Sequence, residues 1–300
     1  MTRNSGFLKI VLMVLVGAAI VPSSFAQDKA PVLLSMKFKA GDISKYATTT
    51  SIGYSIPGLM ASNIQSKMAK SNPGKPTPVV PPTTNVTVNG TQIIKVLKVQ
   101  KNGSGELQVT TDIPNPMAAM MGQGSRKEKP LVSTMVCDSL GHLSGGGMGF
   151  LSTGMLVFPT KPIKPGESWI ETTGISQLAK NAPAKVTFIG YEQVGKYRTA
   201  HLRTVVSAPM NTGFNTSGGL TTKGQGDANM NGTMNIIRDV NFAVAEGKLI
   251  KMTATVDTNM TISGFMGSTS ATKGKTKPAG AANTGMKVTS RTTQEVHLTE

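Results

Sequence analysis

The chain has almost no cysteine, and this absence limits how it can be stabilised. Cys137 is the single cysteine in 300 residues, so no intramolecular disulfide can form. It ends the strand-like run Leu131–Cys137, a setting typical of a buried, unreactive thiol and not of a nucleophile. Aromatic residues make up only 5% of the chain. The core must therefore consist mainly of Val, Ile, Leu and Met.

Histidine and the common catalytic motifs are equally scarce. The three histidines, His142, His201 and His297, are far apart in sequence, and we expect surface roles for them in preference to a metal site. No Gly-x-Ser-x-Gly motif is present, because His142 occupies the first glycine position of the nearest match. The stretch 269–276 imitates a phosphate-binding loop but begins with Thr269 in place of glycine. We expect a protein that is not an enzyme and has no cofactor or metal; a hydrolase with an unrecognised site is the weaker alternative.

Long apolar runs are missing except at the N-terminus. Arg3 and Lys9 flank an apolar stretch at 10–21, and Ser24-Phe-Ala26 suits a signal peptidase. The apolar stretch is shorter than the roughly 20 residues of a membrane span. The next residue, Gln27, is not the cysteine that a lipid anchor requires. Residues 1–26 are therefore predicted to be a signal peptide, and the mature chain to be exported to the periplasm or the extracellular space.

Acidic residues are few, which leaves a strongly basic chain. Lys and Arg number 31 against 15 Asp and Glu, for a formal charge of +16 that becomes +14 when Arg3 and Lys9 are removed. Such a balance favours anionic partners, here lipid headgroups or envelope polymers, and we expect no specific nucleic-acid binding. Solvated loops that need no partner are the simpler explanation of the same charge.

The sequence does contain repeated alternation of apolar and polar residues. Between Lys248 and Gly264 every second residue is apolar and the residues between them are mostly Thr, Asn, Asp and Lys. Further alternating segments lie at 91–100, 106–113, 184–194, 197–208 and 286–298. Turn residues separate them, so we predict an all-β protein with about a dozen antiparallel strands.

Helical spacing is confined to Gly58–Lys70, where Leu59, Met60, Ile64 and Met68 share one face. The proline-rich stretch 71–82 follows and must be extended. The segments 114–130, 209–229 and 264–285 are rich in Gly, Ser, Thr and Ala and are predicted to be loops.

Three short patterns occur in the same order in both halves of the chain. Lys39-Ala-Gly-Asp42 resembles Lys164-Pro-Gly-Glu167, Asn89-Gly-Thr91 resembles Asn231-Gly-Thr233, and the turn at Gly141 resembles the turn at Gly247. Together they predict a duplicated β unit. The first unit spans 27–155 and the second 156–300, and the two lie side by side or are fused into one curved sheet or open barrel.

The only tryptophan follows one of these corners, in the stretch 158–169. We predict that Trp169 anchors a strand and is not a ligand platform, because half-buried aromatics usually serve packing. The same stretch resembles a family of uncharacterised exported bacterial β proteins that carry Leu/Phe-Pro, then Gly-Asp/Glu-x-Trp, between two related halves. That family has a domain of unknown function, so the resemblance implies a fold and no activity. In layout the chain is more distantly similar to periplasmic lipoprotein carriers, whose curved half-barrel holds acyl chains.

These observations favour a non-enzymatic binding module of the bacterial cell envelope with an amphipathic or anionic ligand. The alternative is a structural or interaction protein without a pocket that presents basic loops to envelope polymers. The candidate contacts for an anionic partner are the clustered loop cations Arg126, Lys127, Lys129, Lys273, Lys275 and Lys277.

Binding through these cations is expected to be salt-sensitive. Exposed charges are screened over about 8 Å at physiological ionic strength, so association with anionic lipid vesicles should weaken steeply as salt rises. Neutralising all six cations together should abolish it. Co-sedimentation with such vesicles over a salt series measures the effect. Binding that does not respond to salt points to an apolar pocket instead.

Overall fold

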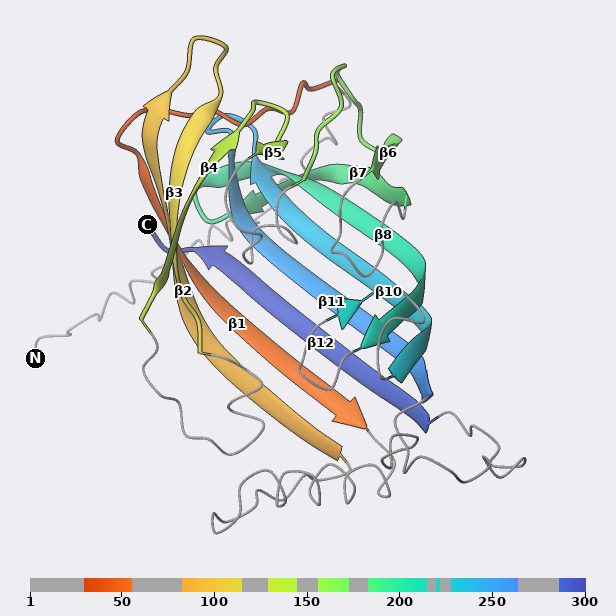
Figure 1. Ribbon diagram of the computed structural model, residues 1–300. Helices are drawn as coiled ribbons and strands as arrows, with labels where there is room; N and C mark the ends of the chain where they lie inside the picture. The colour runs from red at the N-terminus through yellow and green to blue at the C-terminus, as the bar shows by residue number, and fades with distance from the viewer. Residues whose placement is uncertain are drawn as a thin grey trace, which may run out of the picture.

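The computed structural model of the chain describes residues 30–55, 83–114, 129–144, 156–172, 183–214, 220–221, 228–263 and 286–300. All regular structure in these residues is β-strand, as predicted (Figure 1). The strands form one large antiparallel sheet that is not closed into a barrel. The described part contains no helix, and hence none long and apolar enough to cross a membrane.

In the part of the chain that the structure describes, twelve strands build the sheet, in agreement with the predicted dozen. In chain order they are β1 (Ile43–Ser55), β2 (Thr83–Val99), β3 (Gly105–Asp112), β4 (Leu131–Cys137), β5 (Leu143–Ser144), β6 (Ser168–Thr172), β7 (Pro183–Val194), β8 (Tyr197–Phe214), β9 (Leu220–Thr221), β10 (Ala228–Ala243), β11 (Lys248–Ser263) and β12 (Met286–Leu298). Their order across the sheet is β5-β4-β3-β2-β1-β12-β11-β10-β8-β7-β6, with β9 paired to β8. The last strand, β12, lies between β1 and β11 and so joins the two halves of the chain.

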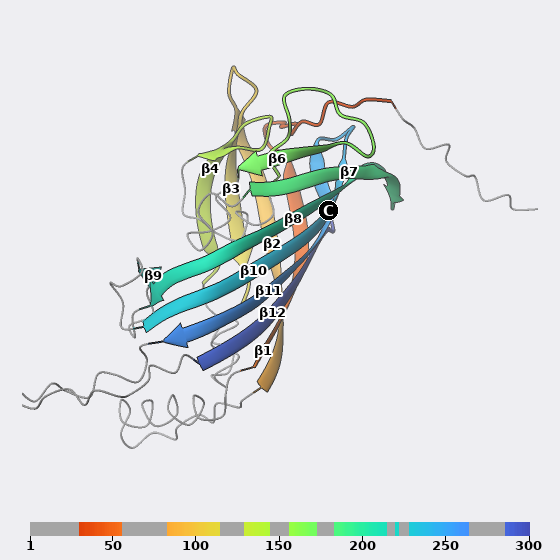
Figure 2. The same ribbon diagram turned by 90° about the vertical axis from the view of Figure 1, so that its right-hand side faces the viewer.

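The alternation in the sequence determines which face of the sheet is buried. Along β8 every even-numbered residue from Ala200 to Met210 is buried, and the residues between them are exposed or half-buried. The same parity holds from Met234 to Phe242 in β10, which pairs with β8. The sheet curves strongly around this buried inner face (Figure 2).

The sequence located most strands but misplaced some ends. The strand predicted at 248–264 is β11, and those at 184–194 and 286–298 are β7 and β12. The loop predicted at 209–229 is wrong at its ends, because β8 continues to Phe214 and β10 begins at Ala228. At the start of β10, residues 228–233, Asn and Thr alternate with Ala, Met and Gly, so this end of the predicted loop follows a strand pattern despite Gly232. The helix predicted at Gly58–Lys70 and the signal peptide lie outside the described residues.

The two Gly-acid corners have the same local geometry. Gly41 and Gly166 have φ values of 87° and 88°, a region that favours glycine. The Gly41 amide donates to the Val96 carbonyl at 2.8 Å, and the Gly166 amide donates to the Phe188 carbonyl at 2.6 Å. A register shift follows Val96 in β2 and Phe188 in β7. The predicted correspondence of these two corners therefore agrees with their backbone hydrogen bonds.

The second predicted correspondence is wrong. Asn89 lies on β2, which pairs directly with β1, the strand that follows the Gly41 corner. The strand that follows the Gly166 corner is β6. Asn231 lies on β10, which is separated from β6 by β7 and β8. Asn-Gly-Thr is a common turn-like and strand-edge pattern, so its recurrence there was coincidental. Gly141 and Gly247 do both lie in turns with positive φ, of 93° and 65°. Duplication of the whole unit, with its boundary at residue 156, stays a prediction.

An extended segment at 30–41, here called the strap, covers the upper end of the curved sheet (Figure 1). Val32 exchanges two backbone hydrogen bonds with Ile163, at 2.8 and 2.9 Å. The Met36 amide donates to the Ser139 carbonyl at 2.7 Å, and the Lys37 amide donates to Gly247 at 3.2 Å. The strap thus contacts three separate turns and connections of the sheet.

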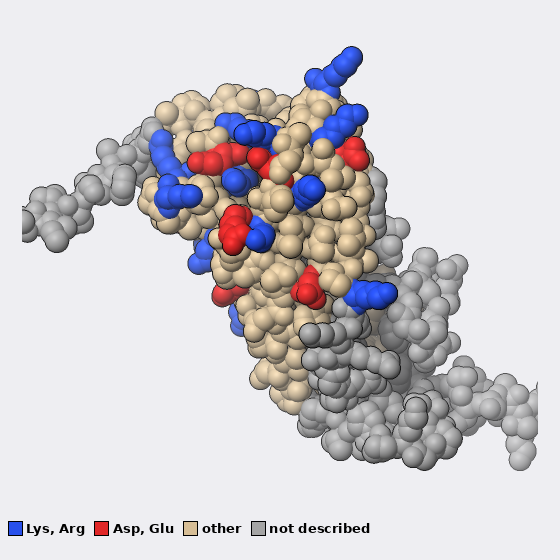
Figure 3. All heavy atoms as spheres, turned by 90° about the vertical axis from the view of Figure 1, so that its left-hand side faces the viewer, with Lys and Arg blue, Asp and Glu red and all other residues tan. Residues whose placement is uncertain are grey.

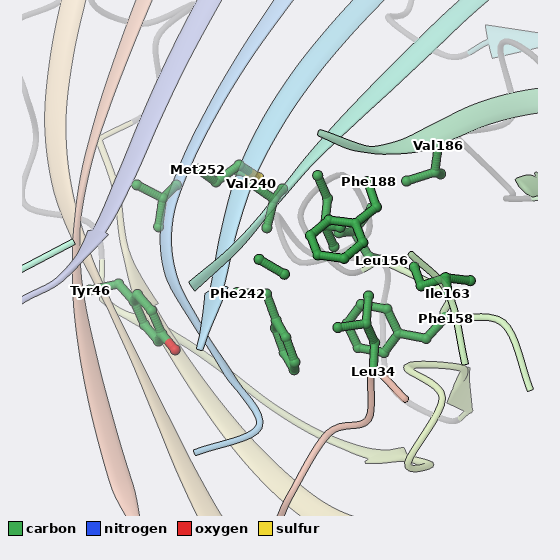
Figure 4. Packing of buried hydrophobic residues seen from close by; sticks show 13 residues of the cluster. Leu34, Tyr46, Leu156, Phe158, Ile163, Val186, Phe188, Val240, Phe242 and Met252 are labelled. Atoms are coloured by element: carbon green, nitrogen blue, oxygen red, sulfur yellow. The ribbon is translucent and has the colours of Figure 1, made fainter. Parts of the chain in front are cut away.

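The strap contributes directly to the largest core cluster. Leu34 is fully buried and packs in this cluster with the 156–163 segment and residues of six strands (Figure 4). Phe158 and Phe242 lie at its centre, with ring centroids 4.7 Å apart. A second cluster lies between β2, β3 and β4 and includes Leu107, Met135 and Cys137. Burial raises the pKa of the Cys137 thiol to about 12, with Asp138 adding to the shift, and the predicted burial of this cysteine is confirmed.

Trp169 serves as the anchor of β6. Its ring is half-buried against the largest cluster, and its indole Nε1 donates to the Val157 carbonyl at 3.0 Å. The hydrogen bond ties β6 to the 156–163 segment, which the strap also holds. The ring does not line the cavity described below.

Truncating Trp169 should therefore destabilise the protein. Trp169→Ala removes a large ring and leaves the Val157 carbonyl without its partner, at a cost of about 3 kcal/mol. Trp169→Phe keeps most of the apolar area and should recover much of this loss. Gly166→Ala tests the adjoining corner, because a side chain at φ of 88° is strained even though nothing lies within 4 Å of the added Cβ. Thermal melts compare all three with wild type. A Trp169→Ala protein that melts like wild type contradicts the anchor role.

Candidate ligand-binding cavity

A cavity of about 290 Å³ lies between the strap and the inner face of the sheet. It lies between two core clusters, because Tyr46, Met252 and Val296 belong to one and Val96 and Leu107 to the other. Its size lies at the lower end of the range for small-molecule sites, about 300–1,000 Å³. The lining is mainly apolar, with a few polar groups.

The strap forms one wall of the cavity. Met36 and Phe38 line it from the strap, and Gly247 lines it from the β10–β11 turn. A Cβ on Gly247 would lie 2.5 Å from the Lys37 amide nitrogen, closer than van der Waals contact allows. Glycine at 247 therefore lets the strap pass close to the turn, which shapes this side of the cavity.

The closed end of the cavity is formed by buried residues of β1 and β2. Tyr46 and Gln92 are directly opposite each other in the β1–β2 register and are 4% and 2% exposed. The Tyr46 hydroxyl donates to the Leu249 carbonyl at 3.2 Å. Burial raises the pKa of Tyr46 to about 12, against a smaller opposing effect of its hydrogen bond with Ser44. Burial at this end of the cavity therefore disfavours ionisation of the phenol.

Two neutral side-chain atoms near this end are buried without a partner in the part of the chain that the structure describes. They are Gln92 Nε2 and Thr48 Oγ1. Gln92 lines the cavity, and Thr48 is the next inner-face residue after Tyr46 on β1. A buried polar group without a hydrogen bond costs about 1–3 kcal/mol. An acceptor bound in the cavity would relieve this cost for Gln92.

Charged residues line the rim, and their signs balance. Lys37, Asp42 and Glu246 are exposed and Lys248 is half-buried. The Lys37 ammonium already donates to the Ala245 carbonyl at 2.9 Å. The rim therefore presents two acids and two bases and does not select an anion by net charge.

The predicted anionic-partner contacts are not part of this cavity. Lys129, which is exposed just before β4, is the one of the six within the described residues. Arg126, Lys127, Lys273, Lys275 and Lys277 lie outside them. The charged residues drawn in Figure 3 are mixed in sign over the upper part of that face, and its lower part is mostly uncharged.

His201 has two acidic partners on the outer face, as expected for a surface histidine. Its Nδ1 lies 2.7 Å from Glu192 Oε1 and its Nε2 lies 2.8 Å from Asp239 Oδ1. Burial opposes ionisation of Asp239, but hydrogen bonds from Arg203 and His201 outweigh it and lower its pKa. Among the described residues, no group of three or more His, Cys, Asp and Glu is arranged to hold a metal ion.

A buried ion pair lies elsewhere on the inner face. Arg238 Nη2 is 3.7 Å from Glu171 Oε2, and both side chains are almost completely buried. Arg238 also donates to Thr204 Oγ1 at 3.2 Å. Burial raises the pKa of Glu171, and the guanidinium offsets this only in part. Neither residue lines the cavity, so the pair belongs to the packing of the core.

No family model matches this chain, and no curated protein matches it in sequence. The resemblance to exported bacterial β proteins therefore stays a prediction.

The Glu171 pair yields a pH-dependent contribution to stability. Because the folded-state pKa of Glu171 is raised, the folded protein keeps a proton that the unfolded chain has lost. The contribution of Glu171 to the free energy of unfolding should therefore fall as the pH rises from the pKa of this group in the unfolded chain to its pKa in the folded protein. Glu171→Gln removes this slope. Urea unfolding of both proteins over a pH series measures the difference. A stability difference that does not change with pH, or changes in the opposite direction, contradicts the assignment.

Proposed function

We propose that this protein is a non-enzymatic binding module that holds a small amphipathic ligand in the cavity beneath the strap. The observation that carries the proposal is the combination of an apolar lining with a buried, unpartnered amide at the closed end. The core of a folded protein is normally packed without gaps of this size, and its buried polar groups are normally hydrogen-bonded. A cavity that has both features matches a ligand site better than it matches a core.

The cellular location of the protein is part of the same proposal. The predicted signal peptide at 1–26 directs the chain out of the cytoplasm, to the periplasm or the extracellular space. In the cell envelope, amphipathic molecules need a carrier or a sink because their apolar parts are poorly soluble in water. A β-sheet protein with an apolar internal cavity suits that task.

The competing proposal is an interaction protein that presents basic loops to anionic polymers. The formal charge of +16 favours it. The cavity has no role in that proposal, and the salt series on anionic vesicles tests it separately. Native mass spectrometry of protein purified from its own host distinguishes the two, because a co-purifying small molecule supports the cavity.

Filling the cavity should reduce ligand binding. Leu249 is half-buried and lines the cavity, and Leu249→Trp adds volume that the cavity must accommodate. We expect the affinity for an apolar fluorescent probe, 1-N-phenylnaphthylamine, to fall about tenfold or more, since an overpacked site excludes its ligand. Fluorescence titration measures this affinity.

Leu131→Trp is the matched control. Leu131 is 62% exposed on β4 and does not line the cavity, so the same change there should leave binding unaltered. Equal affinities of wild type and Leu249→Trp, with both proteins folded by circular dichroism, contradict the cavity as the site.

A further inference from the structure

We infer that the cavity selects a neutral amphiphile, whose hydrogen-bond acceptor enters first and is held by the amide of Gln92. This inference rests on the proposed function and names the chemical class of its ligand: an apolar chain that ends in a ketone, ester or amide carbonyl. The residues at the closed end and at the rim carry the argument.

The closed end supplies a donor that lacks an acceptor. Gln92 Nε2 is buried without a hydrogen-bond partner, and Gln92 lines the cavity. The terminal torsion of a glutamine side chain is broad, so the amide can turn toward a bound molecule at little cost. A carbonyl oxygen that accepts from Nε2 pairs a donor that is otherwise unpaired.

The same end disfavours an anionic head. None of the described residues that form it is a cation: its polar groups are Gln92, the hydroxyl of Ser44, and the buried hydroxyl of Tyr46, which is hydrogen-bonded to Ser44 and donates to the Leu249 carbonyl. Burial raises the pKa of Tyr46, and the same desolvation penalises a carboxylate placed beside it. A neutral acceptor has no such penalty.

The rim offers no compensating attraction for an anion. Its two lysines, Lys37 and Lys248, are balanced by Asp42 and Glu246, and Lys37 is already hydrogen-bonded to Ala245. The stretch between rim and closed end is apolar and suits a hydrocarbon chain. It is lined by Met36, Phe38, Ile94, Leu107, Leu249 and Met252. A ligand whose carbonyl accepts from Gln92 and whose chain extends toward the rim matches both the closed end and the apolar stretch.

Two ligands of equal chain length test the inference. We compare 2-octanone with octanoate at pH 8 by displacement of 1-N-phenylnaphthylamine from the full mature chain. We expect 2-octanone to bind at least tenfold more tightly than octanoate. Equal affinity, or tighter binding of octanoate, overturns the inference.

Variants of two buried glutamines assign the effect to Gln92. Gln92→Leu should weaken 2-octanone about fivefold relative to any change in the affinity for the apolar probe, as expected for one lost hydrogen bond. Gln294→Leu is the matched control: Gln294 is also buried on the inner face, but it donates to Thr50 Oγ1 and does not line the cavity. It should leave both affinities unchanged.

The outcomes separate this inference from the function on which it rests. If neither the probe nor 2-octanone binds, the proposed function fails together with the inference. If both bind but Gln92→Leu leaves the ketone affinity unchanged, the cavity remains a ligand site and the inference alone fails. Gln92→Met, which keeps the length of the side chain and removes the donor, replaces Gln92→Leu if that variant does not fold by circular dichroism.

Discussion

The buried inner face of this protein depends on the backbone hydrogen bonds that hold the strap. A curved sheet that does not close into a barrel leaves its inner apolar residues facing an opening. At the upper end the strap crosses this opening and is fixed at Ile163, Ser139 and Gly247. Leu34 then completes a core cluster whose other members come from both halves of the chain. Without these contacts, the largest cluster would be exposed on the side opposite the sheet.

The position of the cavity follows from how narrow the strap is. A single extended segment places alternate side chains inward, here Leu34, Met36 and Phe38, and these occupy one line across the opening. Leu34 fills the space over the cluster around Phe158, and Phe38 packs on the cluster of β2, β3 and β4. Between these two positions the inner faces of β1 and β11 are left partly uncovered. The cavity occupies that gap.

Local patterns in the sequence located most of the strands but did not reveal the cavity. The two-residue alternation identified β7, β11 and β12 closely, because half-buried strands impose that period on the sequence. The strap carries the same alternation, but it belongs to no strand of the sheet. Its role depends on hydrogen bonds with three turns or connections that are distant in sequence, and no local pattern predicts these. Gln92 likewise looks like an ordinary polar residue in a strand. A glutamine on the apolar side of the 91–100 alternation was the available signal, since Gln92 shares parity with Ile94 and Val96.

Other buried polar residues of the inner face show why Gln92 differs from them. Gln294 donates to Thr50, and Arg238 donates to Thr204 and faces the carboxylate of Glu171. Gln294 and Arg238 thus have hydrogen-bond partners, whereas both carboxylate oxygens of Glu171 are buried without one in the described residues. Of the two neutral buried atoms that lack partners in the described residues, Gln92 Nε2 belongs to a residue that lines the cavity, and Thr48 lies two residues along β1 from Tyr46, which also lines it. Glu171 faces a guanidinium, whereas Gln92 faces an apolar cavity, and departures from local pairing in natural proteins are expected at functional sites. We therefore propose that a ligand, and not imperfect packing, accounts for the unpaired donor beside the apolar wall of this cavity.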